Sequence, residues 1–381
     1  MASLSSAADL RDRLDSDESL TVVDTRGDES FESWRIADSI QYFYKPFHEF
    51  DIADFEGKTG LAPDDSIVTL CAKGKASADL AEELAEAGYE DITVVEGGME
   101  AWSAVYDHVQ IEYDAFTVVQ LQRRAKGCLG YVVESDGKAA VIDATRHAEE
   151  LTAAADDLDA NIVAVFDTHI HADHISGGRR LAADLDVPYY LGDGAADRDV
   201  QYDYAALGTN EVVSVGDLDI KALSTPGHTS EMVSYLLGAE AVITGDTIFV
   251  DAVGRTELQF GDGDAKTGAG LLYDSLHRTL MAEPDAINVL PGHFSVANDG
   301  TTTITPGEPV DTTVGALRTS LDILRHERGS FIDIITAKLP EKPPNYESVI
   351  SINSGHETAD DEEATTLELG PNRCAAEVDA D

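Results

Sequence analysis

The sequence predicts two α/β domains, a small N-terminal one with a parallel sheet and a larger one built as a four-layer α/β/β/α sandwich. Three observations support this. The chain has 381 residues, enough for two domains at about 150 residues each. Over residues 1–108, short apolar runs alternate with helical patterns. Over 113–381, a series of strand patterns is twice followed by helices, as two sheets with outer helices require.

The N-terminal domain, 1–108, shows three strand patterns and one clear helix. Residues 20–24 (LTVVD), 66–71 (SIVTLC) and 92–98 (ITVVEGG) are short apolar runs typical of buried strands. Residues 77–88 have apolar side chains at helical spacing, and Gly88 is a typical helix stop. This alternation of strand and helix favours a parallel sheet.

The second domain, 113–381, begins after a linker expected near 107–115. Helices are expected at 148–158, at 176–185 and around 270–282. Strands are expected at 116–121, 129–135, 139–144, 162–169, 211–215, 218–224, 232–237, 241–246 and 287–293. The acidic stretch 356–370 is expected to be a mobile surface loop or tail.

The composition is strongly acidic, with 73 Asp and Glu against 26 Lys and Arg and a net charge of −47. Such a surface repels nucleic acid and anionic lipid, so neither is expected as a partner. Since 43% of the residues are hydrophobic, the chain can still bury a core. The acid excess resembles the surfaces of halophilic proteins. Because molar salt shortens the screening length to about 3 Å, we expect the fold to need salt.

Cysteine usage and the apolar runs bear on the compartment. Cys71, Cys128 and Cys374 do not suggest a disulfide framework, and the first 20 residues lack the apolar core of a signal peptide. No apolar run approaches the about 18 residues of a membrane span. We therefore expect a cytoplasmic protein, with a homodimer left open. Cys128 and Cys374 have no histidine or cysteine close in sequence, so both are expected to be core thiols.

A cluster of metal-capable side chains follows the strand at 162–169. The stretch FDTHIHADHISGG (166–178) contains His169, His171, Asp173 and His174 on a loop between a strand end and a helix start. Such a loop can direct several side chains at one point, although a single histidine there would more often be a polar turn.

The same kinds of ligand recur at three later strand ends. His228 lies in STPGHTS, Asp246 in ITGDTIF and His293 in LPGHF. Imidazole and carboxylate together suit Zn, Fe or Mn. This constellation closely resembles the metallo-β-lactamase superfamily over residues 113–345. The resemblance implies the α/β/β/α fold, with a metal site in the cleft between the two sheets.

Two chemistries are open within that superfamily. The hydrolase form, as in the glyoxalase II family, uses two Zn(II) ions to direct a hydroxide at a thioester. The family pattern would place His169, His171 and His228 on one ion, Asp173, His174 and His293 on the other, and Asp246 between them. The dioxygenase form uses one Fe(II) per chain. It would be held by His169, His228 and Asp246, with the remaining four residues orienting these ligands.

The segment 245–267 favours the dioxygenase. Its Gly254, Arg255, Thr256, Glu257, Leu258 and Gln259 resemble the Gly-Arg-Thr-acid-Phe-Gln pattern of the persulfide dioxygenase family, with leucine in place of phenylalanine. The resemblance implies that Arg255 binds a carboxylate of the thiol substrate, with Thr256 and Gln259 as further substrate-binding residues. The alternative for Arg255 is an ion pair with a nearby acid. Residues 338–355 also resemble that family's C-terminal segment.

The N-terminal domain resembles the rhodanese domain in three stretches. These are VVDTRGDESFESWRIADSI (22–40), the loop CAKGKAS (71–77) and VVEGGMEAW (94–102). The resemblance implies that Cys71 carries sulfane sulfur as a persulfide, and the start of a helix there favours a thiolate. The alternative is a buried structural cysteine. The usual arginine of the loop is Ala76 here, although Lys73 and Lys75 could replace its charge.

Together these patterns predict a fusion that oxidises a low-molecular-weight thiol persulfide with O₂ to sulfite at a mononuclear non-haem Fe(II), with Cys71 delivering sulfur. A glyoxalase II-like dinuclear zinc thioester hydrolase is the first alternative. A non-catalytic sulfur-binding protein is the second.

Overall fold

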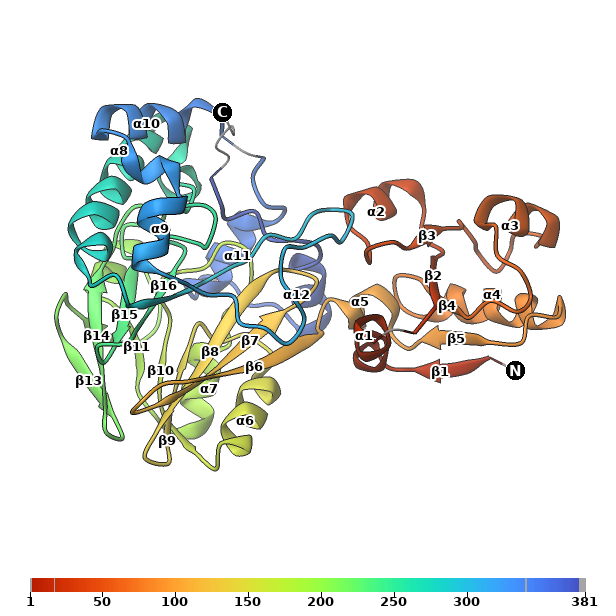
Figure 1. Ribbon diagram of the computed structural model, residues 1–381, viewed down its shortest axis with the longest axis horizontal. Coiled ribbons are helices and arrows are strands. Elements are labelled where there is room, and N and C mark those ends of the chain that lie inside the picture. Colours follow the sequence, from red (N-terminus) through yellow and green to blue (C-terminus); the bar gives the residue numbers. More distant parts are fainter. Residues whose placement is uncertain (1, 17, 340, 377–381) are drawn as a thin grey trace.

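The computed structural model describes residues 2–16, 18–339 and 341–376 and shows two domains. In Figure 1 the N-terminal domain, coloured red to orange, lies to one side of a larger sandwich of two sheets. This architecture confirms the fold predicted from the sequence.

The N-terminal domain is a five-stranded sheet, in the order β1-β5-β4-β2-β3, with every pair of neighbours parallel. Its strands are β1 (Ser3–Ser5), β2 (Thr21–Asp24), β3 (Ile40–Gln41), β4 (Ile67–Leu70) and β5 (Ile92–Val95). Its helices are α1 (Ala7–Asp15), α2 (Asp28–Ser33), α3 (Ile52–Thr59), α4 (Lys75–Glu86) and α5 (Gly98–Trp102). Strands β4 and β5 are buried along their whole length, as central parallel strands are when helices cover both faces.

The second domain starts with a seven-stranded sheet in the order β12-β11-β10-β9-β8-β7-β6. Its strands are β6 (Tyr106–Glu112), β7 (Thr117–Arg123), β8 (Cys128–Ser135), β9 (Lys138–Ile142), β10 (Asn161–Phe166), β11 (Tyr189–Gly192) and β12 (Ala205–Leu207). Helices α6 (Ala148–Asp157) and α7 (Gly178–Leu185) cover its outer face. The stretch expected as a linker, 107–115, thus contains most of β6, which pairs with β7 over its full length.

A six-stranded sheet in the order β13-β14-β15-β16-β17-β18 completes the sandwich. Its strands are β13 (Val212–Val215), β14 (Leu218–Ser224), β15 (Val233–Leu237), β16 (Ala241–Gly245), β17 (Asn288–Pro291) and β18 (Thr312–Thr313). Helices α8 (Glu257–Arg278), α9 (Val314–Ser320) and α10 (Arg328–Ala337) cover its outer face. Short 3-10 turns lie at Asp193–Arg198, Leu280–Ala282 and Asp322–Arg325.

Three buried clusters hold these four layers together. Tyr131, Phe166 and Tyr235 belong to the cluster between the two sheets. A second cluster packs α6 and α7 on the first sheet, and a third packs α8, α9 and α10 on the second. Each sheet carries apolar side chains on both faces, so one face must be covered by the other sheet and the opposite face by helices. Burial of these side chains therefore explains the order of the four layers.

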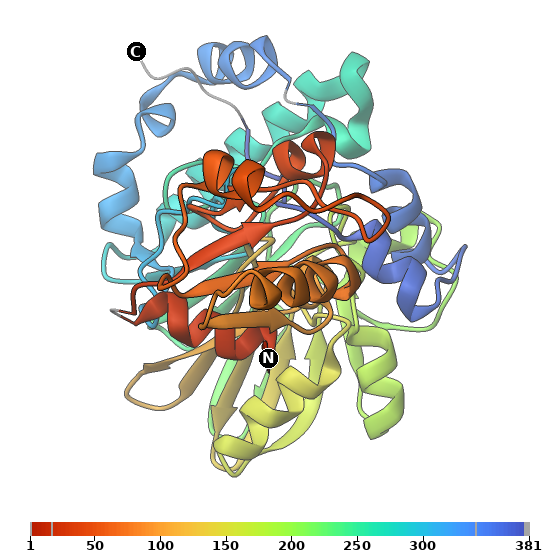
Figure 2. The same ribbon diagram turned by 90° about the vertical axis from the view of Figure 1, so that its right-hand side faces the viewer.

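The C-terminal part of the chain contradicts our expectation of a mobile loop at 356–370. Helix α11 (Tyr346–Asn353) is followed by helix α12 (Asp361–Leu367), whose first turn is capped by Asp360. Glu368, directly after α12, is only 1% exposed. The acidic composition suggested a solvated segment, but Val349 and Ala364 pack against Ile175 beside the histidine loop. In Figure 2 these dark blue helices lie beside the N-terminal domain, which faces the viewer.

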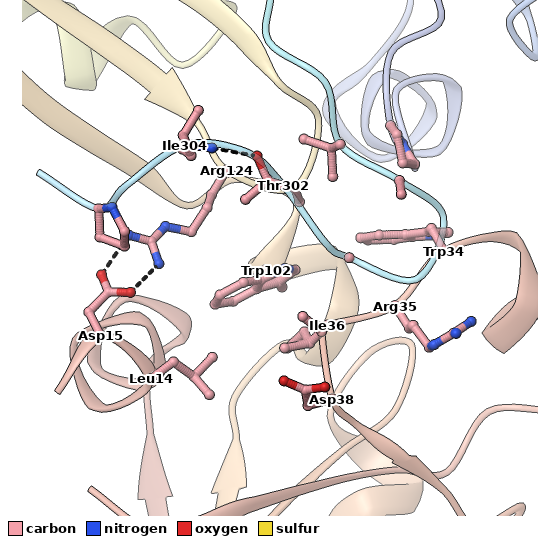
Figure 3. A pocket seen from close by; sticks show the side chains of 17 residues that line it. Leu14, Asp15, Trp34, Arg35, Ile36, Asp38, Trp102, Arg124, Thr302 and Ile304 are labelled. Carbon is pink, nitrogen blue, oxygen red and sulfur yellow. Dashed lines mark hydrogen bonds and ion pairs between the residues drawn. The ribbon is translucent and has the colours of Figure 1, made fainter. Parts of the chain in front are cut away.

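The two domains meet across a cavity of about 260 Å³ (Figure 3). Trp34, Ile36 and Trp102 of the N-terminal domain line it, opposite Thr302 and Ile304 of the second domain. At one edge of the cavity, Arg124 makes a bidentate ion pair with Asp15, with N–O distances of 2.6 and 2.5 Å. The tethered domains therefore share a contact with an apolar centre and a charged edge.

Two further expectations concern the whole chain. Among the residues that the structure describes, no helix is both long and apolar enough to cross a bilayer. The three cysteines are free thiols, consistent with the absence of a disulfide framework, and all three are buried, Cys71 included.

Candidate metal centre and sulfur-carrier loop

The predicted metal-capable residues come together at one edge of the sandwich because of strand direction. Strands β9 and β10 are parallel neighbours, and Asp143 and the loop 167–174 follow their carboxyl ends. In the other sheet, β14, β16 and β17 run in one direction, so the segments after them reach the same edge. These segments carry His228, Asp246 and His293.

His169, His228 and Asp246 form one compact group, with one potential ligand atom from each lying within 4.8 Å of the others. The distances from Asp246 Oδ2 are 3.5 Å to His228 Nε2 and 3.9 Å to His169 Nε2. All three side chains are buried. Two imidazoles and one carboxylate in this arrangement can share one ion.

Hydrogen bonds on the far side of each imidazole fix which nitrogen faces this group. His228 Nδ1 lies 2.7 Å from the carbonyl oxygen of Arg255, which can only accept, so Nδ1 carries the proton. Thr168 Oγ1 donates to Asp143 and therefore accepts from His169 Nδ1, 3.0 Å away. Both Nε2 atoms are thus left with a lone pair directed at Asp246, as metal-binding histidines require.

Within the described residues, His169 Nε2, His228 Nε2 and Asp246 Oδ2 are buried and have no hydrogen-bond partner. A buried polar atom without a partner costs about 1–3 kcal/mol. Burial also lowers the pKa of His169 well below 6.5, so its imidazole is neutral. These three atoms fit a bound cation, which would satisfy all of them at once.

A second group lies next to the first and consists of Asp173, His174, His293 and Cys128. Here the polar atoms are partnered. His293 Nδ1 lies 2.6 Å from Asp246 Oδ1, and its Nε2 lies 2.9 Å from Asp173 Oδ2. Burial lowers the pKa of His293, but the facing Asp246 and Asp173 outweigh it and raise that pKa well above 6.5. His293 is therefore an imidazolium that bridges two carboxylates.

His171 does not join either of these groups. Its Nε2 lies 3.2 Å from Asp143 Oδ1, and the two form a third cluster with Asp167. Its ring remains close to His169, with centroids 4.2 Å apart. Both ring nitrogens of His171 are buried and also lack a hydrogen-bond partner. The structure thus groups His169 with His228 and Asp246 and places His171 in a separate cluster with Asp143 and Asp167.

Arg255 is 1% exposed and is held by its own neighbourhood. Its Nε lies 2.5 Å from Glu257 Oε1, and Nη1 donates to the carbonyl oxygens of Glu341 and Arg373. Thr256 donates to the carbonyl oxygen of Ala265 and is also buried. The alternative interpretation of Arg255, an ion pair with a nearby acid, is therefore observed as a pair with Glu257, and this pair is buried.

Gln259, the third residue expected to bind substrate, is bonded to the loop that carries His228. Its Oε1 accepts from the amide of Ser230 at 2.6 Å and from Arg198 at 3.0 Å. Its Nε2 donates to Ser230 Oγ at 2.7 Å. Gln259 therefore supports the loop in this conformation.

Cys374 is a residue of this site that sequence reasoning missed. It is fully buried, and its Sγ forms a further potential ligand group with Asp246 and His293, within 4.8 Å. Cys128 was missed in the same way, and its Sγ lies 3.0 Å from Asp173 Oδ2. Neither cysteine is a polar residue at the end of a strand, the pattern that identified the other residues, so the sequence gave no indication that either lies at this site. Asp143 does follow that rule and could have been found.

The Cys71 loop lies between β4 and α4, as predicted. Cys71 is buried, and Ser77 Oγ lies 3.6 Å from its Sγ. The Gly-Gly segment packs on this loop, where Met99 N donates to Cys71 O at 2.8 Å. Gly98 has a φ of +56°, and a Cβ there would lie 2.0 Å from Cys71 O, so only glycine fits.

The Cys71 loop also faces the second domain. A cavity of about 350 Å³ is lined by Ala72 and Met99 on one side and by Pro371 and Arg373 on the other. Lys73, the residue after Ala72, pairs with Glu362 of α12 at 2.8 Å. Lys73, proposed to replace the missing arginine of the loop, thus bonds the other domain in this structure.

Comparison with known proteins agrees with both domains. A family model described as "Rhodanese-like domain" matches residues 6–105, and one described as "Metallo-beta-lactamase superfamily" matches residues 123–293. The cytoplasmic hydroxyacylglutathione hydrolase of Arabidopsis thaliana is 32% identical over 218 residues, which are 55% of this chain and 78% of that protein. The chain belongs to the metallo-beta-lactamase superfamily.

Solved structures of this superfamily are similar as well. ETHE1 from Myxococcus xanthus is 29% identical, with a TM-score of 0.52, and the match covers 62% of this chain and 97% of that one. The metallo-beta-lactamase from Staphylococcus aureus subsp. aureus COL is 26% identical, with a TM-score of 0.58, covering 64% of this chain and 74% of the other. This superfamily member therefore carries a rhodanese-like domain before a domain with His and Asp clusters suited to metal.

Proposed function

We propose that this chain is a persulfide dioxygenase. A low-molecular-weight thiol persulfide, RSSH, reacts with O₂ and water to give RSH, sulfite and two protons. Bound Fe(II) supplies the redox chemistry and the open positions at which O₂ and a sulfur can meet. The Cys71 loop loads sulfane sulfur, and the tether between the domains raises its concentration near the centre.

The observation that carries the proposal is the contrast between the two groups of side chains. The atoms of His169, His228 and Asp246 that face one another lack partners. Those of Asp173 and His293 bond each other and Asp246 instead. Three grouped ligands for one ion thus lack partners, while Asp173 and His293 act as a hydrogen-bonded support. His171 also lacks partners but lies in a separate cluster with Asp143 and Asp167. The resemblance of 245–267 to the persulfide dioxygenase family points the same way.

Each residue then has a defined task. His169, His228 and Asp246 hold the ion, and His293 holds Asp246 in its orientation through the 2.6 Å hydrogen bond. Arg255 remains the proposed partner of a substrate carboxylate. It now binds the carbonyl oxygens of Glu341 and Arg373, so this task requires the C-terminal segment to give way.

The test is anaerobic purification in high salt, metal analysis and an oxygen-electrode assay with glutathione persulfide or cysteine persulfide. We expect one iron per chain, O₂ uptake and sulfite. Asp246→Asn should lose both iron and turnover, whereas His171→Asn should keep its iron. Two zinc ions per chain with anaerobic cleavage of a thioester would refute the proposal, and so would loss of the iron in His171→Asn.

A two-zinc thioester hydrolase is the second candidate, and two observations favour it. A group of four potential ligands, Cys128, Asp173, His174 and His293, lies directly beside the first group. The relative from Arabidopsis thaliana is named a hydroxyacylglutathione hydrolase. An anaerobic assay with S-lactoylglutathione distinguishes this candidate, because hydrolysis needs no oxygen. A protein without turnover in either assay would fit the sulfur-binding alternative.

A further inference from the structure

The loop that carries His169 depends on remote side chains for its shape. Within the part of the chain that the structure describes, residues 169–175 make no backbone–backbone hydrogen bond. Carboxylates from other segments bind this backbone instead. Asp143 Oδ1 accepts from the amide of Thr168 at 2.7 Å, and Glu231 Oε1 accepts from the amide of Ile170 at 3.0 Å. The backbone on each side of His169 is therefore held by a remote carboxylate.

Glu231 belongs to the segment that carries another proposed ligand. It follows His228 by three residues, and its side chain is 0% exposed. Its backbone packs against the end of β11, where a Cβ on Gly192 would lie 2.4 Å from Glu231 O. One buried carboxylate thus joins the backbone next to His169 to the segment that presents His228.

Arg198 binds the other oxygen of this carboxylate. It ends the 3-10 turn Asp193–Arg198, and only 10% of its side chain is exposed. Its Nη1 donates to Glu231 Oε2 and, at 3.0 Å, to Gln259 Oε1. Hydrogen bonds of a charged donor are stronger than neutral ones, and burial strengthens them further. The carboxylate of Glu231 is therefore held at both oxygens.

Gln259 extends this network to the segment that follows Asp246. Its Oε1 accepts from the amide of Ser230 at 2.6 Å, and its Nε2 donates to Ser230 Oγ at 2.7 Å. In the same segment, Arg255 O accepts from His228 Nδ1 at 2.7 Å. The segments after β10, β14 and β16 each carry one proposed ligand, and buried hydrogen bonds thus join all three.

We infer that Glu231 and Arg198 are positioning residues of the metal centre, and that their ion pair sets the separation of His169 from His228. Neither belongs to a potential ligand group, so each acts through the groups that it holds. An ion binds both imidazoles only when each Nε2 lies at about 2.0–2.1 Å, so a shift of the loop by about an ångström weakens binding. This rests on the metal centre of the proposed function and deepens it. Gln259, expected to bind substrate, is the third member of the network.

The test measures Co(II) binding to the full chain, freed of metal, in high salt without oxygen and in competition with a chelator. Arg198→Met removes the donor. Glu231→Gln turns an amide nitrogen towards either Ile170 N or Arg198, both of which donate. We expect each variant to bind Co(II) about 10- to 100-fold more weakly and to alter its d–d bands. The double variant should lose less than the two single losses combined, because both break one network.

Asp24→Asn is the matched control, because it removes a buried carboxylate that pairs with Arg26 in the N-terminal domain. It should lower stability and keep the wild-type Co(II) affinity and d–d bands. Wild-type affinity and bands in Arg198→Met and Glu231→Gln would overturn the inference. So would a control that weakens Co(II) binding as much as they do, because general destabilisation would then explain the loss.

A second measurement needs no variant, so it stands even if Glu231→Gln does not fold. Amide hydrogen exchange of the metal-free wild type, followed by NMR, should show slow exchange at Ile170, because Glu231 accepts its hydrogen bond without any metal. Exchange at the rate of an unprotected amide would overturn the inference. Neither measurement involves O₂, so absence of dioxygenase activity would refute the proposed function and leave the roles of Glu231 and Arg198 standing.

Discussion

Replacement of Glu368 by glutamine is expected to destabilise the fold by about 3 kcal/mol at neutral pH. The carboxylate is buried and accepts three hydrogen bonds from distant parts of the chain. Oε2 accepts from Arg123 at 3.0 Å and from Arg146 at 2.9 Å, and Oε1 accepts from the amide of Ile175 at 2.7 Å. Because Ile175 follows His174, Glu368 links the histidine loop to the end of α12.

The magnitude follows from the pKa of this carboxyl. Burial alone would raise it, but Arg123 and Arg146 outweigh burial and lower the pKa of Glu368 from 4.5 to about 2. At about 1.4 kcal/mol per pH unit, this difference corresponds to about 3 kcal/mol of stability. Removing one partner of a buried ion pair costs about 3–5 kcal/mol, which agrees. Because the pKa is lower in the folded state, this stability is present above pH 4.5 and is lost as the pH falls from 4.5 towards 2.

The assay is urea unfolding in 2 M KCl, followed by circular dichroism, for the wild type and Glu368→Gln between pH 7 and pH 4. Glu363→Gln is the matched control, because it removes the same charge from an exposed position in α12. We expect a lower free energy of unfolding for Glu368→Gln at pH 7 and a difference that narrows below pH 4.5. A variant as stable as the control, or a difference that grows on acidification, would refute this reasoning.

Four other outcomes are expected. Raising KCl from 0.1 to 2 M should raise the melting temperature, because the screening length falls from about 10 Å to below 3 Å while 73 acidic residues repel one another; an unchanged melting temperature would contradict this. Gly98→Ala should cost more than about 1 kcal/mol and reduce sulfur loading of Cys71, measured by cyanolysis, since its Cβ would lie 2.0 Å from Cys71 O. Asp246→Asn should weaken metal binding by more than about 100-fold in competition with a chelator, and wild-type affinity would count against the site. Cys71→Ser should abolish sulfur loading of the N-terminal domain while added free persulfide is still oxidised, and complete loss of O₂ uptake would show that Cys71 has another role.

The sequence by itself determined the architecture and the first approximation to the site. Apolar runs at strand spacing and helical patterns after them predict both domains, because burial of apolar side chains decides which layers can pack. Polar residues at strand ends predict a shared metal site, and the resemblance to a known family singles out His169, His228 and Asp246 as its ligands. That the strands carrying these residues run in one direction, and so place their carboxyl ends at one edge, comes from the sheet topology.

Only the tertiary structure decided how the individual atoms are partnered. Whether His171 faces a metal group or Asp143, and whether His293 bonds two carboxylates, depends on separations of about an ångström that no spacing in the sequence encodes. Cys374 lies 128 residues after Asp246, in a C-terminal region whose acidic composition suggests exposure to solvent. The hydrogen bonds of Arg255 and the burial of Glu368 bring that region back over the centre, and such long-range contacts arise only when the chain has folded.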